Sequence, residues 1–461
     1  MTYKNRVAVV YIAALFLQIM DATIVNVAIP TLAETFDVTS SQMDWTVLAF
    51  TTALGVMTAS AGWFSDRFGA KRVFLVSLLG FVVTSAMCGA AQNLEQLVLG
   101  RALQGAFAGT ITPVGSTLLF NAFPISERSI ASRKVVTVAV IAPAVGPVAG
   151  GAILEVASWR WIFFVNVPVG LIALVLGWRW LREDEDVEVG RFDITGFVLL
   201  ATGFSLALYG LSRGGEQGWG SAPILVSLVA GVALLGLLVV FERRATDPLL
   251  DLSLVRDRIF RTSNIVALPT YAGFLSLIFL LALYLQDEGG RSALQSGLAT
   301  FPQPLGVLLM TQIAGRFLYK QLGPRRLIMA GALTATAVGL GLAAQQPTAD
   351  LWIFQLLMFG RGLAMGLVFV PLQAAVFAKM APAQMSQATA LYGTTRQLSP
   401  AIGVAIASTV LSAGLANTVV GSTARIGAYQ QAMVISAVMF VLALVAATRL
   451  RDEDAAATMA R

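Results

Sequence analysis

One carboxylate lies inside a long apolar stretch near the start of the chain. Asp21 is the only charged residue between residues 7 and 30, a stretch long enough to cross a bilayer as a helix. A charge at membrane depth costs at least roughly 2.5–3.5 kcal/mol, so it usually marks a pathway for protons, ions or substrate. The chain contains no histidine. A proton step within the membrane would therefore use a carboxyl group, and Asp21 is the predicted carrier.

Arg101 is the predicted partner of this carboxylate. A helix that starts near Val7 carries Asp21 about 21 Å inward, about 9 Å from the far side of a hydrocarbon layer roughly 30 Å thick. Arg101, near the start of the span 97–121, lies roughly 6 Å from that same side. If the two helices are neighbours, the charges can pair, and separating them would favour protonation of Asp21. The alternative is a fixed, purely structural ion pair.

A second group of polar residues follows the second apolar span. Its predicted role is a latch between helix ends, and its members are Gly62, Asp66, Arg67, Gly69, Lys71 and Arg72. The glycines permit tight turns and close helix contacts, and Asp66 could pair with a neighbouring basic residue or cap a helix N-terminus. The alternative is a solvated basic loop. A similar stretch from Gly315 to Arg326 has Tyr319 and Lys320 where an acid is expected, so it predicts no equivalent latch.

Two further groups of candidates lie inside apolar spans. Glycine and proline in one span predict a conformational hinge or, alternatively, a kinked packing helix, at Gly146, Pro147, Gly150 and Gly151. Polar residues in other spans predict a substrate cavity formed by Asn26, Gln104, Arg361, Gln373 and Arg396. The alternatives for this second group are interhelical contacts, hydrogen bonds to backbone carbonyls, or side chains that reach toward an interface.

The composition places these residues in a polytopic membrane protein. The 461 residues are 57% hydrophobic and 12% charged, against about 25% charged in soluble domains. The expected fold class is all-α and integral to the membrane, with fourteen spans. Their expected bounds are 7–30, 44–64, 73–91, 97–121, 135–156, 161–181, 194–211, 222–242, 262–286, 297–318, 325–345, 350–378, 388–413 and 427–448.

The basic residues predict the orientation of these spans. Of 31 lysines and arginines, three fall inside spans and only four fall in loops on the side opposite the N-terminus, namely Arg160, Arg213, Arg291 and Arg425. Because cytoplasmic loops are enriched in basic residues, both termini are expected in the cytoplasm, with the protein multi-pass in the plasma (cytoplasmic) membrane. This distribution also explains the net charge of +6 without a nucleic-acid partner.

Three echoes between distant segments indicate an internal duplication. Gly100–Leu103 is echoed by Gly360–Leu363, Ala142–Gly146 by Ser399–Gly403, and the loop from Gly62 to Arg72 by the loop from Gly315 to Arg326. The echoes share one register, offset by eight spans. The predicted organisation is a six-helix bundle over residues 1–181, an inserted helix pair with flanking loops over 182–261, and a second six-helix bundle with a short tail over 262–461. Repeated bundles with a site between them are typical of transporters.

These motifs resemble those of the major facilitator superfamily. The loop Gly62–Arg72 resembles its signature loop, Leu99–Gly105 its arginine motif in span 4, and Gly146–Gly151 the span-5 motif of its proton-coupled exporters. Met20–Pro30 and Trp159–Pro168 resemble features of its fourteen-span drug:proton antiporter branch. The resemblance implies a major facilitator fold of 6 + 2 + 6 helices, alternating access, and an outward bias from the span-5 element.

The expected function is proton-coupled antiport that exports hydrophobic or amphipathic compounds, as in multidrug efflux and antibiotic resistance. The expected partners are a small amphipathic substrate, protons and the lipid bilayer, with the proton gradient as energy source, no cofactor, no metal, and function as a monomer. The alternatives are a dedicated exporter of one lipid, siderophore or antibiotic, and an uncoupled facilitator. An enzyme is not expected, because the chain has no histidine and only one cysteine. Three arginines in the spans against one central carboxylate favour neutral or anionic substrates, or a cation that competes for Asp21.

Overall fold

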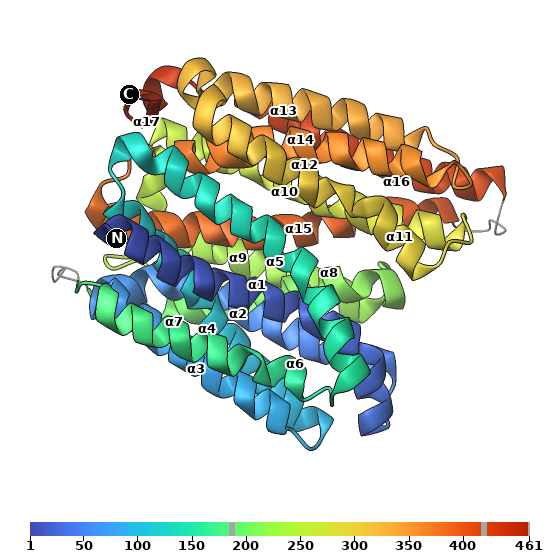
Figure 1. Ribbon diagram of the computed structural model, residues 1–461, viewed down its shortest axis with the longest axis horizontal. Coiled ribbons are helices and arrows are strands. Elements are labelled where there is room, and N and C mark those ends of the chain that lie inside the picture. Colours follow the sequence, from blue (N-terminus) through green and yellow to red (C-terminus); the bar gives the residue numbers. More distant parts are fainter. Residues whose placement is uncertain (184–189, 416–421, 460–461) are drawn as a thin grey trace.

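The apolar spans form long helices that run side by side (Figure 1). The computed structural model describes residues 1–183, 190–415 and 422–459, and no strand occurs among them. The helices of the first bundle are α1 (Tyr3–Phe36), α2 (Ser40–Phe68), α3 (Ala70–Ala90), α4 (Leu94–Ala122), α5 (Arg128–Val156), α6 (Trp161–Phe164) and α7 (Asn166–Trp180), with the short 3₁₀ turn η1 (Ile125–Glu127) between α4 and α5.

The second bundle has a similar series of helices. Its members are α10 (Arg258–Asp287), α11 (Ala293–Thr300), α12 (Pro302–Ile313), the π turn η3 (Ala314–Leu318), α13 (Tyr319–Ala343), α14 (Leu351–Val376), α15 (Met385–Leu415) and α16 (Thr423–Ala447). The short elements η2 (Leu252–Arg256), η4 (Pro382–Gln384), η5 (Asp452–Ala455) and α17 (Ala456–Met459) complete the chain.

A glycine with positive φ turns the chain at corresponding places in the two bundles. α2 ends at Phe68 because Gly69 takes a φ of 82°, a conformation that residues with a side chain rarely adopt. In the second bundle Gly323 has φ 75° and ψ 167°, so the chain turns there even though α13 continues on both sides. The two echoed loops thus both turn at a glycine with positive φ.

The inserted pair, α8 (Ile194–Gln217) and α9 (Ala222–Glu242), lies at the junction of the two bundles. α8 packs against α9 and also contacts α2 of the first bundle and α15 of the second. Phe204 of α8 fills the space beside Gly55 of α2, where an added Cβ would lie 2.1 Å from the phenyl ring. The far end of α8 is tied to α2 by an ion pair between Arg213 and Asp44, with 3.7 Å between nitrogen and oxygen.

The number of membrane spans depends on how two segments are counted. Twelve helical segments of the described residues are long and apolar enough to cross a membrane. One of them, Leu294–Ala343, is 50 residues long and includes the turn at Gly323. α4, with 29 residues, is too polar to qualify. By this criterion the described residues contain two spans fewer than the expected fourteen, so the exact number is not confirmed.

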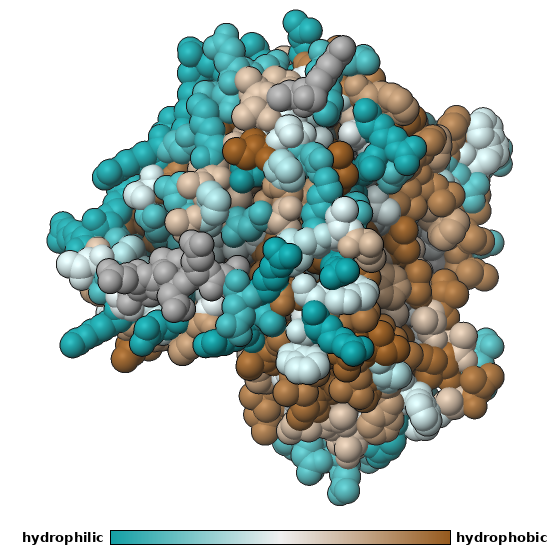
Figure 2. Space-filling model, turned by 60° about the vertical axis from the view of Figure 1, so that its left-hand side comes forward, coloured by the Kyte–Doolittle hydropathy of each residue, from teal (hydrophilic) through white to brown (hydrophobic). Residues whose placement is uncertain are grey.

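The flanks of the molecule are apolar, whereas hydrophilic side chains gather at the end that holds both termini (Figures 1 and 2). Large apolar side chains that lie exposed on the helices include Val76, Ile172, Val229, Leu356 and Leu442. A soluble protein rarely exposes so much contiguous apolar surface, so these flanks are the surface that contacts lipid.

The two bundles contact one another at the end with the termini. The hydrogen bonds that join residues 1–181 to residues 262–459 in the described parts of the chain all lie there. Thr117 bonds to Thr389 at 2.8 Å, and the Gln312 side chain donates to Thr137 at 3.0 Å. Arg128 donates through Nη2 to the carbonyl of Met380 at 3.1 Å. Toward the other end the bundles diverge (Figure 1).

Candidate functional site

The Asp21 carboxylate is buried inside the first bundle, where three side chains donate hydrogen bonds to it. Its Oδ2 accepts from Nη1 of Arg101 at 2.6 Å. Its Oδ1 accepts from Nδ2 of Asn166 at 2.7 Å and from Nε2 of Gln104 at 3.0 Å. The side chains of Asp21 and Arg101 are 0% and 1% exposed. The structure thus brings the two predicted proton-coupling residues into a desolvated ion pair.

Three helices position these groups. α4 carries Arg101 and Gln104 one turn apart, so both side chains reach α1, and Nη1 of Arg101 also donates to Oε1 of Gln104 at 2.7 Å. The break between α6 and α7 places Asn166 at the first position of α7, from which it also donates to Ser85 at 3.1 Å. The guanidinium carbon of Arg101 lies 3.9 Å from the centre of the Phe50 ring, so an aromatic face covers the cation.

The site is well paired but not saturated. Nε of Arg101 and Oδ1 of Asn166 are buried and have no hydrogen-bond partner among the described residues. Removing one member of a buried ion pair costs about 3–5 kcal/mol, because the other charge is left without compensation. Protonation of Asp21 would cancel its charge and weaken its bond to Nη1 of Arg101. The guanidinium, which also has the unsatisfied Nε–H, could then turn toward another acceptor. The arrangement can therefore exchange one proton for a change in side-chain contacts.

Asn166 is the member of this site that was not among the predicted site residues. Its sequence signal is an amide at the start of an apolar helix, inside the stretch Trp159–Pro168 that carries part of the family resemblance. Gln104, by contrast, was expected to line the substrate cavity. The structure places it in the Asp21 site instead, 0% exposed.

The predicted hinge residues divide into two pairs. Gly146 and Gly150 face α1, where an added Cβ on Gly146 would lie 2.1 Å from Oγ1 of Thr23, and one on Gly150 would lie 2.9 Å from Ile24. Gly151 has no atom within 4 Å of such a Cβ, and Pro147 lies on the exposed side. α5 is continuous through all four positions. The glycines thus allow α5 to approach α1 within one turn of Asp21.

The acid of the predicted latch joins the two bundles. Asp66, near the end of α2, accepts hydrogen bonds from Ser386 and from Nε2 of Gln387, the latter at 3.1 Å. Both donors lie in the first turn of α15. Gly62 makes room for Gln387, since an added Cβ would lie 2.9 Å from that side chain. Asp66 therefore binds the start of a helix of the other bundle rather than a basic residue of its own loop.

The basic residues of this loop have separate surroundings. Arg72 forms an exposed ion pair with Glu183 at 3.5 Å, whereas Arg67 and Lys71 make no ion pair with any residue the structure describes. The second copy of the loop has no acid of its own, and Asp452 from the C-terminal segment accepts a hydrogen bond from the backbone N–H of Arg325 at 2.9 Å. That contact stays within the second bundle.

Arg361 is completely buried but has no carboxylate partner among the described residues. Its Nη1 donates to Oε1 of Gln303 at 3.0 Å, and its Nη2 donates to the carbonyls of Gly273 and Phe274 at 3.1 and 2.7 Å. The rings of Phe274 and Phe440 lie 5.2 and 5.8 Å from the guanidinium carbon. This is the arrangement expected if Arg361 holds helices together instead of lining a cavity.

The remaining cavity candidates lie apart from one another. Arg396 is partly exposed on α15, with its guanidinium carbon 5.7 Å from the ring of Tyr271, and forms no ion pair within the described parts of the chain. Tyr271 bonds to Tyr392 at 3.3 Å and stacks on Phe369 at 5.2 Å. Asn26 is exposed on α1, and Gln373 is 4% exposed in α14. Arg396 is thus the one candidate with an accessible charge beside an aromatic cluster.

Twelve long apolar helical segments among the described residues, with a buried ion pair inside one of the two bundles, make this chain a multi-pass membrane protein. The model of the Major Facilitator Superfamily matches residues 11–404 and 265–459, so the chain belongs to that family. Within the family it falls in the multidrug efflux branch.

Individual relatives agree with this assignment. The chain is 34% identical over 397 residues to the multidrug export protein EmrB of Haemophilus influenzae, covering 85% of this chain and 78% of that protein. It is 34% identical over 408 residues to the puromycin resistance protein pur8 of Streptomyces alboniger, covering 87% and 80%. The fold is similar to that of the human organic anion transporter MFSD10, with a TM-score of 0.70, 16% identity, and coverage of 97% and 100%.

Proposed function

We propose that this protein is a proton-coupled antiporter that exports hydrophobic or amphipathic compounds by alternating access. The observation that carries the proposal is the Asp21–Arg101 ion pair, a titratable carboxylate sealed inside a transmembrane bundle. The named functions of the relatives, multidrug export and puromycin resistance, support export as the direction of transport and small compounds as the substrates.

The coupling step uses residues of the first bundle. A proton that reaches Asp21 from the side opposite the termini neutralises the carboxylate and frees Arg101. The contact of α5 with α1 at Gly146 lies beside this carboxylate, so a change in the ion pair alters how the two helices pack. The proton then leaves toward the side of the termini, and the restored carboxylate pairs with Arg101 again. In this scheme both termini are cytoplasmic, and the proton gradient supplies the energy without a cofactor.

The contacts between the bundles define the conformation of this state. Asp66 holds the start of α15, and Arg128 donates to two backbone carbonyls, of Phe377 and Met380. These bonds close the molecule at the end with the termini, so the state described faces the other side. A cycle of transport breaks them and opens the cytoplasmic side. The chain works as a monomer in this scheme, since both bundles belong to one chain.

Arg396 is the proposed contact for the polar group of the substrate. It presents a partly exposed guanidinium beside the ring of Tyr271. A cation bordered by aromatic rings suits an amphipathic compound with an anionic or strongly accepting group, because the rings contact its apolar part. Asn26 and Gln373 lie apart from Arg396 and stay predicted cavity residues without an assigned contact.

The test is substrate-induced proton movement in proteoliposomes, measured for the wild type, Asp21→Asn and Asp44→Asn with cationic, neutral and anionic amphiphiles. Asp21→Asn is expected to abolish coupled proton movement, because an amide accepts the Arg101 hydrogen bond but takes up no proton. Asp44→Asn is the matched control, since Asp44 lies at the far end of α2 and is 43% exposed. Substrate movement without protons, unchanged in Asp21→Asn, would establish an uncoupled facilitator instead.

A further inference from the structure

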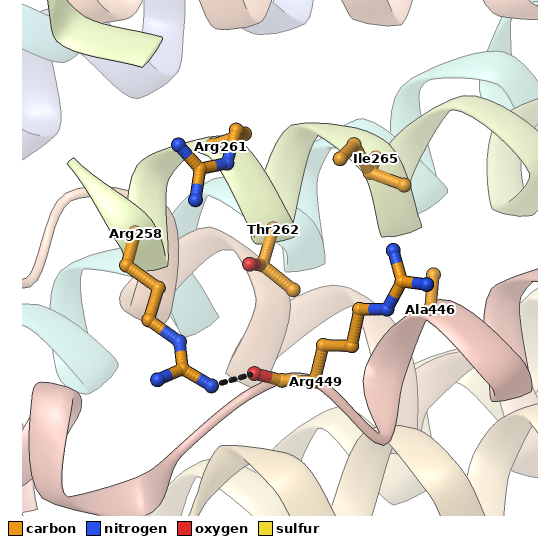
Figure 3. A pocket seen from close by; sticks show the side chains of 6 residues that line it. All are labelled: Arg258, Arg261, Thr262, Ile265, Ala446 and Arg449. Atoms are coloured by element: carbon orange, nitrogen blue, oxygen red, sulfur yellow. Dashed lines mark hydrogen bonds between the residues drawn. The ribbon is translucent and has the colours of Figure 1, made fainter. Parts of the chain in front are cut away.

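A basic cavity lies between α10 and α16, outside the site already described. Its volume is about 330 Å³, and the six residues that line it are Arg258, Arg261, Thr262, Ile265, Ala446 and Arg449, called here the arginine pocket (Figure 3). Three of these six residues are arginines and none is acidic. The pocket lies at the end of the molecule that holds the termini, because α10 begins at Arg258 and Arg449 follows the end of α16.

The arginines of the pocket have no acidic partner among the described residues. Arg258 donates through Nη2 to the carbonyl of Arg449 at 3.2 Å, and Arg261 donates through Nη1 to the carbonyl of Val255 at 3.1 Å. The nearby carboxylate of Asp257 accepts from the backbone N–H of Phe260 as the cap of α10. Three like charges therefore border one cavity without a counterion from the chain, which favours an anion in it.

A hydroxyl group also faces this cavity. Thr262 is 5% exposed, and its side chain points into the space between the three arginines (Figure 3). Among the described residues it makes no hydrogen bond, whereas Thr270 in α10 and Ser436 in α16 bond to the carbonyl four residues earlier. A phosphate oxygen in the pocket would satisfy this donor, and guanidinium groups match phosphate geometry with paired hydrogen bonds.

The surface beyond the pocket is apolar. Along α10 the exposed residues Ile265, Leu268 and Leu275 continue from the pocket toward the middle of the bilayer, and Val445 and Val441 do the same along α16. A water-soluble anion would gain nothing from this strip, whereas acyl chains would cover it. We infer that the arginine pocket binds the phosphate headgroup of an anionic phospholipid whose chains lie along α10 and α16.

The inference is independent of transport. Basic pockets between transmembrane helices on the cytoplasmic side bind anionic lipid headgroups, each arginine contributing about 1 kcal/mol, or about fivefold in affinity. The bound lipid would hold the start of α10 against the end of α16, since its headgroup contacts both. The site makes no use of Asp21, Arg101 or Arg396.

Native mass spectrometry of the purified full chain, with equimolar phosphatidylglycerol and phosphatidylcholine, tests this inference. The wild type is expected to retain phosphatidylglycerol preferentially. The triple variant Arg258→Gln/Arg261→Gln/Arg449→Gln is expected to lose about 100-fold in affinity for it, from about fivefold per arginine. The control variant Arg243→Gln/Arg244→Gln/Arg256→Gln removes the same charge from exposed arginines of the preceding loop and is expected to behave as the wild type.

A second variant keeps all three charges. Ala446→Trp fills the pocket and is expected to remove the preference for phosphatidylglycerol, which keeps the test decisive if the triple variant does not fold. Two soluble probes identify the source of the phosphate: millimolar inorganic phosphate and glycerol 1-phosphate are expected not to displace the lipid. Displacement by either would assign the pocket to a soluble anion and overturn the lipid assignment. Equal losses in the pocket and control variants would overturn the site itself.

Discussion

The two bundles carry a buried arginine in the echoed segments Gly100–Leu103 and Gly360–Leu363, but its partners differ. Arg101 in α4 pairs with the Asp21 carboxylate at 2.6 Å. Arg361 in α14 binds Gln303 and two backbone carbonyls of α10. Both guanidinium groups are shielded from water, and both lie against phenylalanine rings. In the proposed mechanism, the titratable partner is what separates the proton-coupling site from the one that holds helices together.

The largest expected difference comes from removing each arginine in turn. Arg101→Gln leaves Asp21 without a cation, and we expect it to abolish substrate-induced proton movement. Arg361→Gln removes charged hydrogen bonds, with a cost of about 1.5–3 kcal/mol, and is expected to lower thermal stability while the ratio of protons to substrate stays unchanged. Proteoliposome flux and thermal unfolding of each variant measure these effects. Equal loss of coupling in both variants would remove the distinction between the bundles.

Corresponding glycines provide a second comparison. A Cβ on Gly146 would meet the Thr23 side chain at 2.1 Å, whereas one on Gly403 would meet the backbone oxygen of Ala272 at 2.2 Å. A side chain can turn aside but backbone cannot, so Gly403→Ala is expected to lower stability more, within the usual 1–3 kcal/mol of overpacking.

Proton coupling, unlike stability, is expected to suffer more from Gly146→Ala than from Gly403→Ala. Gly146→Ala displaces α1 at Thr23, two residues after Asp21, and should slow coupled transport several-fold. Gly403→Ala should not change the ratio of protons to substrate. Gly151→Ala, which has open space around it, is the control for both assays. A slower proton step in Gly403→Ala than in Gly146→Ala would refute this assignment.

A smaller and opposite effect is expected from giving the second bundle an acid. Oε1 of Gln303 accepts from Arg361, while its Nε2 is buried without a partner. Gln303→Glu replaces the unsatisfied donor with a carboxylate oxygen and gives the buried Arg361 cation, which has no counter-charge among the described residues, an opposite charge. We expect stability to rise by about 1 kcal/mol, measured by thermal unfolding, and proton stoichiometry to remain that of the wild type. A fall in the unfolding temperature would contradict this.

The smallest effect is expected at the surface of the signature loop. Arg72 and Glu183 are 3.5 Å apart, with side chains 70% and 61% exposed. Exposed pairs of this kind contribute about 0–1 kcal/mol, so Arg72→Gln should leave stability and transport close to those of the wild type. A loss of transport as large as that of Arg101→Gln would show a role for Arg72 that its contacts do not explain.

Much of the site could be predicted from the sequence because charge in an apolar helix is a strong signal. The depth of Asp21 and Arg101 followed from the rise per residue, and the structure places them in contact. The partner of Asp66 could not be found in this way, because Ser386 and Gln387 are ordinary polar residues at a helix start, more than 300 residues away. The contacts of Arg361 were foreseen only as an alternative, since backbone acceptors leave no trace in a sequence.

The fold was predictable to a similar extent. Apolar length predicted the helices, and the echoes between distant segments predicted two bundles, whereas the orientation expected from the basic loops stays a prediction. The position of α8 against both α2 and α15 was not predictable, because it depends on the fit of Phe204 to Gly55, and one glycine in a chain with 42 carries little information.

The acceptors of the buried arginines have a consequence for how the two bundles tolerate change over evolution. Backbone carbonyls exist whatever the side chain, so no substitution at position 273 or 274 deletes the acceptor that Arg361 uses. The Asp21–Arg101 pair lacks this protection, because each partner is a side chain that a single codon change can remove. Among related sequences, positions 21 and 101 should therefore change together or not at all, whereas Arg361 keeps its two carbonyl acceptors even where Gln303 is replaced.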